Sequence, residues 1–234
     1  MDRNVYVSDF NKWAVNFGST SGMETLGCQF TDSRDGHVYV CTTIGTQVWM
    51  AENLGYLPSV NTYPSYSSAT SYYYVYEYNG TSVSEAKATA NYGTYGVLYN
   101  WPAAMAACPS GWHLPTDEEW KILEKNQGMT ESDADATIWR NSGTVGGKLK
   151  ETGTSHWYSS NTGVTNSSGF TALPGGYYNS GGFLLLGPRA FFWTASGNGA
   201  SNIWYRALYA EYAGVYRNNY DRGIAMSVRC LQNN

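Results

Sequence analysis

The sharpest helix signal in the chain lies in CPSGWHLPTDEEWKILEK, residues 108–125. Thr116 is placed to cap the N-terminus of a helix, and Glu119 follows it at the spacing of a capping box. Asp117 and Glu118 add negative charge in the first turn, where the helix dipole favours it. The stretch therefore predicts a helix that begins just after Thr116.

This predicted helix is expected to bury one side. Trp120 and Leu123 lie three residues apart and would form an inward stripe. Its later charged side chains are expected to face water: Lys121, Glu124 and Lys125. A shorter helix is predicted at 101–107, because Asn100 can cap it and a proline is tolerated in a first turn.

The sequence around these helices predicts short strands and loops. Residues 26–50 indicate a β-meander with turns at 35–36 and 45–46. The last third, from FFWTAS onward, alternates as short antiparallel strands. Residues 55–80 and 126–182 are rich in small polar residues or Tyr and predict mainly loops. This pattern places the chain in the α+β class.

We expect one domain over residues 26–234, preceded by an appendage and linker at 1–25. In the appendage, Ser8 could cap a short helix that ends at Gly18. The N-terminus lacks the charged start, apolar middle and cleavage site of a secretory signal. Whether such a signal was removed is left open by the sequence.

The composition argues against two kinds of partner. Charged residues make up 14% of the chain, against about 25% in most soluble domains. Aromatic residues reach 16%, with 21 Tyr and 9 Trp, and the net charge is −4 without a basic block. A nucleic-acid partner is therefore not expected. No run of about 18 apolar residues occurs, so no membrane span is expected.

The four cysteines allow three pairings. Cys28 and Cys41 flank the Asp-Gly turn signal at 35–36, so a hairpin could place them opposite each other. Cys108 and Cys230 would then close a long loop, worth about 4–5 kcal/mol in a chain-entropy model. The alternative is four buried free thiols, as in a cytosolic protein.

Five motifs, in order over about residues 29–232, resemble those of the Fibrobacter succinogenes major paralogous domain. They are TDSRDGHVYVCTTIGTQVWMAENLGY, YGVLYNW, CPSGWHLPTDEEW, FTALPGGYY and SVRC. The resemblance implies a C-type-lectin-like fold, akin to formylglycine-generating enzymes, with two helices packed on a small twisted antiparallel sheet and long irregular loops. It also favours disulfides, because lectin-type members join a cysteine near the helices to one in the last strand, which fits Cys108 and Cys230. Met226 departs from the family pattern, which usually has an aromatic residue there.

Neither catalysis nor a metal centre is expected. The three histidines are far apart in the sequence and at no metal-ligand spacing: His37, His113 and His156. Formylglycine-generating enzymes use two cysteines near the C-terminus, where this chain has only Cys230, and no serine-nucleophile motif occurs. Asp133 and Asp135 lack the glycine and terminal glutamate of a calcium loop. We predict a solvated loop there, with a structural calcium ion as the alternative and no other cofactor.

The C-terminal segment GVYRNNYDRG, residues 214–223, is polar and aromatic although it lies between strand-like stretches. Period-two alternation divides the side chains of residues 204–218 between two sides of a sheet. The set expected to point inward is Trp204, Arg206, Leu208, Val215 and Arg217. Residues 219–222 are predicted to form the next turn.

The outward set contains the residue types that enrich antibody paratopes, in which Tyr gives large contact area at low entropic cost. We therefore predict a ligand-binding face formed by Tyr205, Ala207, Tyr209, Glu211, Tyr212, Tyr216, Asn218, Tyr220, Asp221 and Arg222. Its tyrosines would be the anchors, with Glu211, Asp221 and Arg222 tuning specificity and the loops near 177–183 at its edge.

The expected function is a non-enzymatic, extracellular or cell-surface domain that binds a protein or glycan ligand on a cell surface, with a phage particle as a further setting. The resemblance adds that some family members are variable proteins of diversity-generating retroelements. In such members, variation would fall at positions 207, 209, 211, 212, 216, 220 and 221. The alternative is a structural or adhesive surface module without a dedicated ligand site. The ligand's identity and the oligomeric state are left open.

Overall fold

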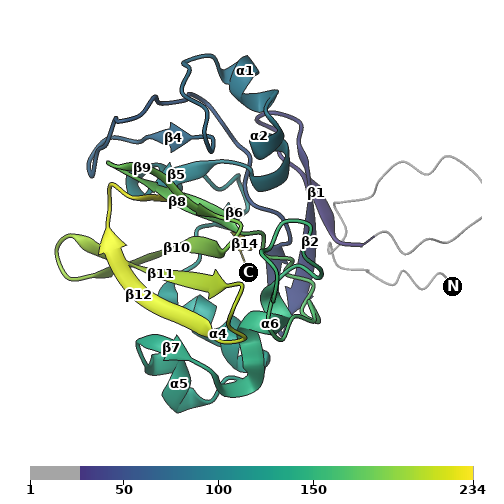
Figure 1. Cartoon of the computed structure of the whole chain (residues 1–234). Coiled ribbons are helices and arrows are strands. Elements are labelled where there is room, and N and C mark those ends of the chain that lie inside the picture. Colours follow the sequence, from purple (N-terminus) through teal and green to yellow (C-terminus); the bar gives the residue numbers. More distant parts are fainter. Residues whose placement is uncertain (1–26, 234) are drawn as a thin grey trace, which may run out of the picture.

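The computed structural model describes residues 27–233, in which short helices surround two β-sheets (Figure 1). This arrangement is α+β, as the sequence predicts. The appendage and linker predicted at 1–25, including the helix after Ser8, lie outside the described residues. No helix within residues 27–233 is long and apolar enough to cross a membrane.

The first sheet joins the two ends of the described chain. Its five strands lie in the order β1 (Gln29–Thr31), β2 (Val38–Ile44), β3 (Gln47–Met50), β14 (Leu231–Gln232) and β6 (Trp112–His113). The predicted meander with its two turns is confirmed, because β1, β2 and β3 pair antiparallel in succession. Leu231 then pairs with both Trp49 and His113, which inserts the last strand between early and middle segments.

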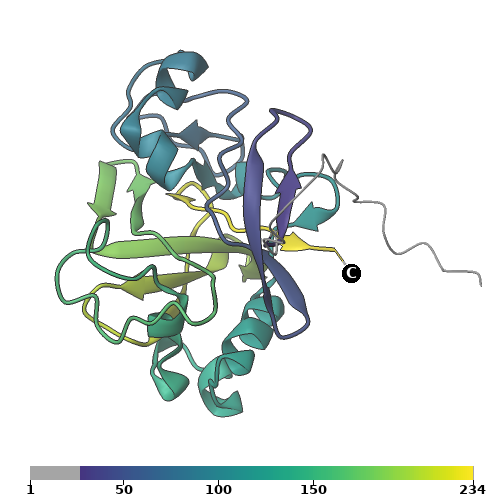
Figure 2. The same ribbon diagram turned by 90° about the vertical axis from the view of Figure 1, so that its right-hand side faces the viewer.

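The second sheet has nine strands and is larger than the small sheet we expected. Its strands are β4 (Tyr73–Tyr74), β5 (Leu98–Asn100), β13 (Ala225–Met226), β8 (Gly175–Asn179), β9 (Gly182–Leu186), β10 (Arg189–Asn198), β11 (Asn202–Tyr209), β12 (Val215–Asp221) and β7 (Ile138–Arg140). All pairings in it are antiparallel except the single one of β8 with β10. The two sheets lie across one another (Figure 2).

One prediction about the terminal strands is wrong. Residues 219–222 were expected to form a turn, but β12 continues through Asp221. Asn219 pairs with Trp204 and Tyr220 with Ile203, so the partner strand β11 extends the ladder beyond the point where the polar sequence suggests a turn. The chain turns only at 222–223.

The helices are short. They are α1 (Val83–Lys87), α2 (Ala90–Tyr95), α3 (Trp101–Ala104), α4 (Asp117–Asn126), α5 (Glu131–Asp135) and α6 (Val145–Leu149). Both predicted caps are confirmed: the side chain of Asn100 accepts from Ala103 N, and Thr116 and Glu119 form the capping box. The solvated loop predicted around Asp133 and Asp135 is instead α5, because Thr130 caps it.

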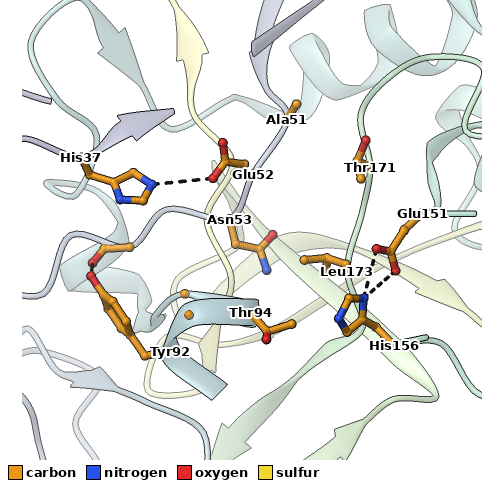
Figure 3. A pocket seen from close by; sticks show the side chains of 13 residues that line it. His37, Ala51, Glu52, Asn53, Tyr92, Thr94, Glu151, His156, Thr171 and Leu173 are labelled. Atoms are coloured by element: carbon orange, nitrogen blue, oxygen red, sulfur yellow. Dashed lines mark hydrogen bonds and ion pairs between the residues drawn. The ribbon is translucent and has the colours of Figure 1, made fainter. Parts of the chain in front are cut away.

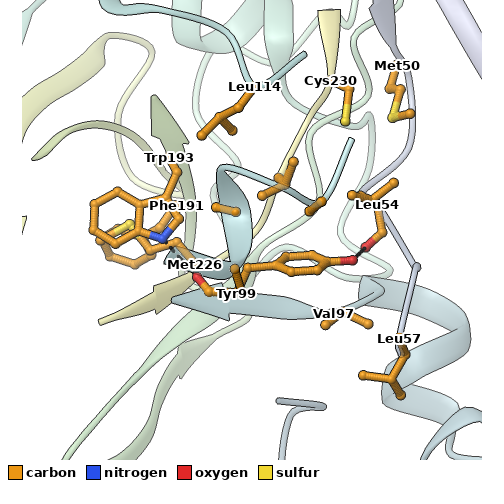
Figure 4. Close-up of a cluster of buried hydrophobic side chains, with 14 of the residues drawn as sticks. Met50, Leu54, Leu57, Val97, Tyr99, Leu114, Phe191, Trp193, Met226 and Cys230 are labelled. Atoms are coloured by element: carbon orange, nitrogen blue, oxygen red, sulfur yellow. Dashed lines mark hydrogen bonds between the residues drawn. The ribbon is translucent and has the colours of Figure 1, made fainter. Parts of the chain in front are cut away.

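Two hydrophobic clusters hold the sheets together. One lies behind β10–β12 and joins α4 to both sheets through Trp49, Trp120, Phe170, Phe192, Leu208 and Val215. The other contains Met50, Leu54, Val97, Tyr99, Phe191, Trp193, Met226 and Cys230 (Figure 4). Trp193 Nε1 donates to Tyr99 O at 2.9 Å, so this buried indole is satisfied as a donor.

Both predicted disulfides are present, so the alternative of four free thiols is wrong. Cys28–Cys41 links β2 to the residue just before β1. Cys108–Cys230 joins residues 122 apart in the sequence and ties the segment after α3 to the segment that enters β14. A crosslink that closes so long a loop removes much conformational entropy from the unfolded chain.

Glu124 corrects the predicted orientation of α4. We expected Glu124 and Lys121 to face water, but both are buried, Glu124 completely. Two arginines reach Glu124 from the second sheet: Arg140 Nη1 donates to it at 2.7 Å and Arg206 Nε at 2.7 Å. A helical pattern shows which residues share a side, but not that basic residues far along the chain will cover that side.

Asp117, two helical turns from Glu124 on the same helix, completes this interface. It accepts from Arg206 Nη1 at 2.6 Å and from Arg217 Nη2 at 2.6 Å. The connected ion pairs involve four cations and four carboxylates: Lys121, Arg140, Arg206 and Arg217 with Asp117, Glu118, Glu124 and Asp135. Glu118 and Asp135 are mostly exposed and pair only with Lys121, so the three arginines share the two buried carboxylates of Asp117 and Glu124. Each buried arginine therefore has a carboxylate partner. We call this set the buried ion network.

Replacing Glu124 with Gln is expected to lower the free energy of unfolding by about 3–5 kcal/mol, because two buried arginines lose their shared carboxylate. Denaturant unfolding measures this effect. The matched control is Glu131→Gln, which breaks an exposed pair with Lys125 and should cost less than about 1 kcal/mol. Equal losses in the two variants would contradict a structural role for the network.

A pH dependence follows from Asp117. Burial alone would raise its pKa, but the hydrogen bond from Arg217 and the charge of Arg206 lower the pKa to about 2. In the unfolded chain the pKa of Asp is about 3.9. The folded value is the lower one, so the stabilisation is present above about pH 4 and is lost as the pH falls from about 4 toward 2.

We expect this loss to amount to roughly 2–3 kcal/mol in the free energy of unfolding. Asp117→Asn should be less stable at neutral pH and should lose less stability between about pH 4 and pH 2. Denaturant unfolding at a series of pH values tests this. Parallel curves for the variant and the native protein would show that Asp117 does not carry the effect.

Candidate ligand-binding face

The strands β10, β11 and β12 turn one side toward α4 and the other side away from it. Pairing registers place Trp204, Arg206 and Leu208 on the α4 side, together with Val215 and Arg217. The opposite side carries a group of aromatic residues that we call the tyrosine face: Trp139, Tyr177, Tyr205, Tyr209, Tyr212, Tyr216 and Tyr220. The alternation predicted from the sequence therefore separates the two sides correctly.

Ring contacts connect the whole tyrosine face. The Trp139 ring lies 4.3 Å from that of Tyr212, 4.7 Å from Tyr209 and 5.1 Å from Tyr216. Farther along, the Tyr205 ring lies 6.3 Å from Tyr216 and 6.2 Å from Tyr220. Aromatic pairs in this distance range attract each other beyond their buried area. The rings are thus held in place before any partner arrives, which lowers the entropic cost of binding.

The ten predicted site residues do not all reach the surface. Tyr212 and Tyr220 are the most exposed tyrosines of the face, at 46% and 39%. Glu211 is exposed, and five others are half-buried: Tyr209, Tyr216, Asn218, Asp221 and Arg222. Tyr205 and Ala207 are buried, so they support the face from beneath instead of presenting a surface.

Several polar members of the predicted set are already engaged. Asp221 accepts from the Tyr66 hydroxyl and from Gly223 N. Asn218 Nδ2 donates to the Tyr216 hydroxyl at 3.1 Å. The guanidinium of Arg222 lies over the Trp101 ring, and its Nη2 donates to a backbone carbonyl. These contacts fix the rim of the face.

Two residues of this site were missed by the sequence prediction. Trp139 lies in β7, in a stretch read as loop, and reaches the face because β7 pairs with β12. Arg189 begins β10 and lies directly opposite Tyr209. Alternation carried back from the inward Phe192 would have placed Arg189 on the tyrosine side, but nothing in the sequence shows which strand lies beside which.

A small hollow of about 110 Å³ opens in the tyrosine face. Its lining combines phenols, apolar side chains and one cation: Tyr177, Leu185, Arg189, Phe191, Tyr205, Tyr209, Tyr220 and Met226. Met226 lines this hollow and is fully buried. The predicted edge near 177–183 thus contributes Tyr177 to the same site.

Lys150 holds the turn that carries Tyr212. The side chain is fully buried, and Nζ donates to Thr162 O, Tyr209 O and Tyr212 O at 2.9–3.0 Å. Burial lowers the pKa of Lys150 to about 8, so the side chain is still mostly protonated at neutral pH. The same turn packs on α6, where Gly147 N donates to Ala213 O at 3.0 Å.

A larger hollow, of about 420 Å³, lies elsewhere and brings together His37 and His156 (Figure 3). His156 Nδ1 contacts Glu151 at 2.8 Å, and His37 Nε2 lies 3.6 Å from Glu52. The third histidine, His113, is not part of it and instead contacts Glu119 and Asn233. Within residues 27–233 no group of three or more potential ligands could hold a metal ion.

The polar groups of this larger hollow are bound to one another. Asn53 accepts from Arg229 Nε at 2.8 Å and donates to Tyr95 O at 3.0 Å, so both ends of its amide are used. The Tyr92 hydroxyl donates to Gly55 O. The tyrosine face, by contrast, contains the cation Arg189, whose hydrogen-bonding capacity is largely free. The tyrosine face is therefore the better candidate for a ligand-binding site.

Asp133 and Asp135, the pair considered for calcium, are both bound within the protein. Asp133 accepts from Ser142 N at 3.0 Å, and Asp135 accepts from Lys121 Nζ at 2.7 Å. Hydrogen bonding to Ser142 lowers the pKa of Asp133, and the hydrogen bond and charge of Lys121 lower that of Asp135. These carboxylates therefore help to position α5.

Replacing Lys150 with Met should remove the ammonium donor shared by three backbone carbonyl groups, two of them in the turn at 209–212, and this turn should loosen. Amide hydrogen exchange is expected to be faster there than in the native protein, with a loss of about 1–3 kcal/mol in local stability. Lys148→Met is the control, because Lys148 donates to a single carbonyl outside this turn. Unchanged exchange at 209–212 would argue against the anchoring role.

Comparison with known proteins identifies one family. The model described as the Fibrobacter succinogenes major domain matches residues 42–232. No curated protein and no solved structure matches the chain.

Proposed function

The chain belongs to the Fibrobacter succinogenes major domain family, and within that family we propose for it a non-enzymatic role in ligand binding. The tyrosine face would contact a protein or glycan on a cell surface. The proposal includes a C-type-lectin-like arrangement, which is supported by the α3 and α4 helices beside largely antiparallel sheets and by the Cys108–Cys230 link to the end of the chain.

One observation carries the proposal: the preassembled aromatic layer with Tyr212 and Tyr220 exposed at its surface. Exposed tyrosines joined by ring contacts supply large contact area with little conformational freedom to lose. The side facing α4 is anchored by the buried ion network, so the outer side chains are not needed to hold the strands in place. This division between a structural side and an outer side suits a surface that binds a partner.

The two disulfides support a location outside the reducing cytosol, either extracellular, on the cell surface or on a phage particle. The alternative of a structural or adhesive module would use the same rigid scaffold without a dedicated ligand. The decisive difference between these roles is whether individual tyrosines matter for binding.

Diversification by a retroelement is a further part of the proposal, and burial limits where it could act. Ala207 has no exposed surface, so a larger side chain there would have to displace its neighbours. Glu211 and Tyr212, by contrast, are exposed. Sequencing of the neighbouring DNA for a near-copy of codons 200–230 beside a reverse transcriptase tests this idea; its absence would contradict it.

Tyr212→Ala and Tyr220→Ala are each expected to weaken binding about tenfold or more, as loss of a hot-spot tyrosine does. The test is binding to an array of bacterial surface glycans and surface proteins, followed by titration of the strongest spot. The control is Tyr63→Ala, because Tyr63 is similarly exposed but packs on Phe183, on the other side of the β8–β9 hairpin from Tyr177.

Thermal unfolding should show that the three variants remain folded. If Tyr212→Ala and Tyr220→Ala bind as well as Tyr63→Ala, the tyrosine face is not the binding site and the structural-module alternative is favoured.

A further inference from the structure

Arg189 is the cation of the hollow in the tyrosine face. Its guanidinium carbon lies 3.9 Å from the centre of the Tyr209 ring, and its Nη1 donates to the Tyr209 hydroxyl at 3.2 Å. Stacking of this kind fixes the plane of the guanidinium while its edge stays open to a further acceptor.

The hydrogen-bonding capacity of Arg189 is largely unused. A guanidinium has five N–H donors, and Nε of Arg189 is buried without any partner. Among residues 27–233, no carboxylate forms an ion pair with Arg189, although Arg140, Arg206 and Arg217 all have one. Nε has almost no accessible surface, so an acceptor that enters the hollow would meet the two Nη atoms, of which only Nη1 forms a hydrogen bond within residues 27–233.

Arg222 and Arg229 also have no ion-paired carboxylate among residues 27–233. The guanidinium of Arg222 lies over the Trp101 ring, outside the hollow, and its Nε is likewise buried without a partner. For Arg229, burial lowers the pKa to about 9. Its donors are nevertheless occupied by Asn53 and by the backbone carbonyls of Met50, Phe170 and Thr171. Arg229 is therefore satisfied as a structural group, whereas Arg189 is not.

The surroundings of Arg189 suit an anion. Tyr177, Tyr209 and Tyr220 bring phenol groups to the same hollow. Burial raises the pKa of Tyr177 and of Tyr209, and the charge of Arg189 opposes each shift, so the cation lies close to both phenols. At neutral pH these protonated hydroxyls can donate to an oxygen that Arg189 already attracts.

The size of the hollow limits the group that can enter. At about 110 Å³ the hollow is small and opens at the surface, so it suits one compact group of a larger ligand. A carboxylate carried on one or two methylenes is such a group. Leu185, Phe191 and Met226 offer apolar contact to the methylenes.

We propose that the tyrosine face recognises an acidic protein segment by inserting one Asp or Glu side chain into this hollow, where Arg189 binds the carboxylate through its guanidinium. This rests on the proposed function of the face and adds the chemistry of its ligand. Arg189 is the central anchor, and the exposed Tyr212 and Tyr220 contact the rest of the segment.

The experiment is selection of random 12-residue peptides displayed on phage against the immobilised protein. We expect the selected peptides to share an Asp or Glu, and their affinity to fall roughly 10- to 100-fold for Arg189→Gln, as expected for loss of a charge-assisted hydrogen bond. Arg189→Lys should retain part of the affinity, because it keeps the charge and loses the fork.

Lys125→Gln is the matched control, since it removes one positive charge on α4, away from the face, and should leave affinity unchanged. Replacement of the shared Asp or Glu of a selected peptide by Asn or Gln should lower the affinity as much as Arg189→Gln does. When both changes are made together, the affinity should fall little further than with either change alone. Thermal unfolding checks that Arg189→Gln remains folded.

The inference would be overturned if the selected peptides shared no Asp or Glu, or if they bound the Arg189→Gln variant as tightly as the native protein. If those peptides still depend on Tyr212 and Tyr220, the proposed function stands; if they depend on neither, it fails as well. Oligogalacturonate serves as an acidic glycan probe. If it binds and no acidic peptide is selected, the proposal of a protein ligand is overturned, and the carboxylate that Arg189 binds belongs to a sugar.

Discussion

Asp117 and Glu124 hold three arginines from three different strands at one buried interface. Arg140 comes from β7, Arg206 from β11 and Arg217 from β12. A buried charge without a partner is strongly destabilising, so none of these strands can shift relative to α4 without breaking several compensated contacts. The position of the terminal hairpin, and with it the position of the tyrosine face, depends on this constraint.

This constraint also gives the two sides of the same strands different roles: one side holds the fold together, and the other forms the candidate binding face. Side chains that point toward α4 are constrained by packing and by charge balance. On the opposite side Tyr205 and Ala207 are still constrained by packing, whereas Tyr212 and Tyr220 are exposed. The tyrosines there organise themselves through ring contacts, and Lys150 fixes the turn beside them. Arg189 differs from the arginines of the buried ion network because no carboxylate among residues 27–233 forms an ion pair with it. A cation without a carboxylate partner favours the binding of an anionic group from a ligand.

Local features were predictable from sequence. The capping box at Thr116 and Glu119, the Asn100 cap and the hairpin turn at 35–36 depend on residues a few positions apart, and all are present. The Cys28–Cys41 crosslink could be inferred from the same hairpin. In the candidate site, period-two alternation correctly assigned Arg206 and Tyr209 to opposite sides.

Features that depend on distant segments were not predictable. By itself the sequence determined the caps, the turns and the alternation, because these follow from backbone geometry within a few residues. Only the tertiary structure decided that Glu124 is buried, that β12 continues to Asp221 and that Ala207 lies beneath its neighbours. The same holds for Arg189 in a tyrosine-lined hollow, since the residues that line this hollow come from six strands, β8 to β13. The physical reason is that burial and charge compensation are properties of what packs against a residue, and the packing partners lie far away along the chain.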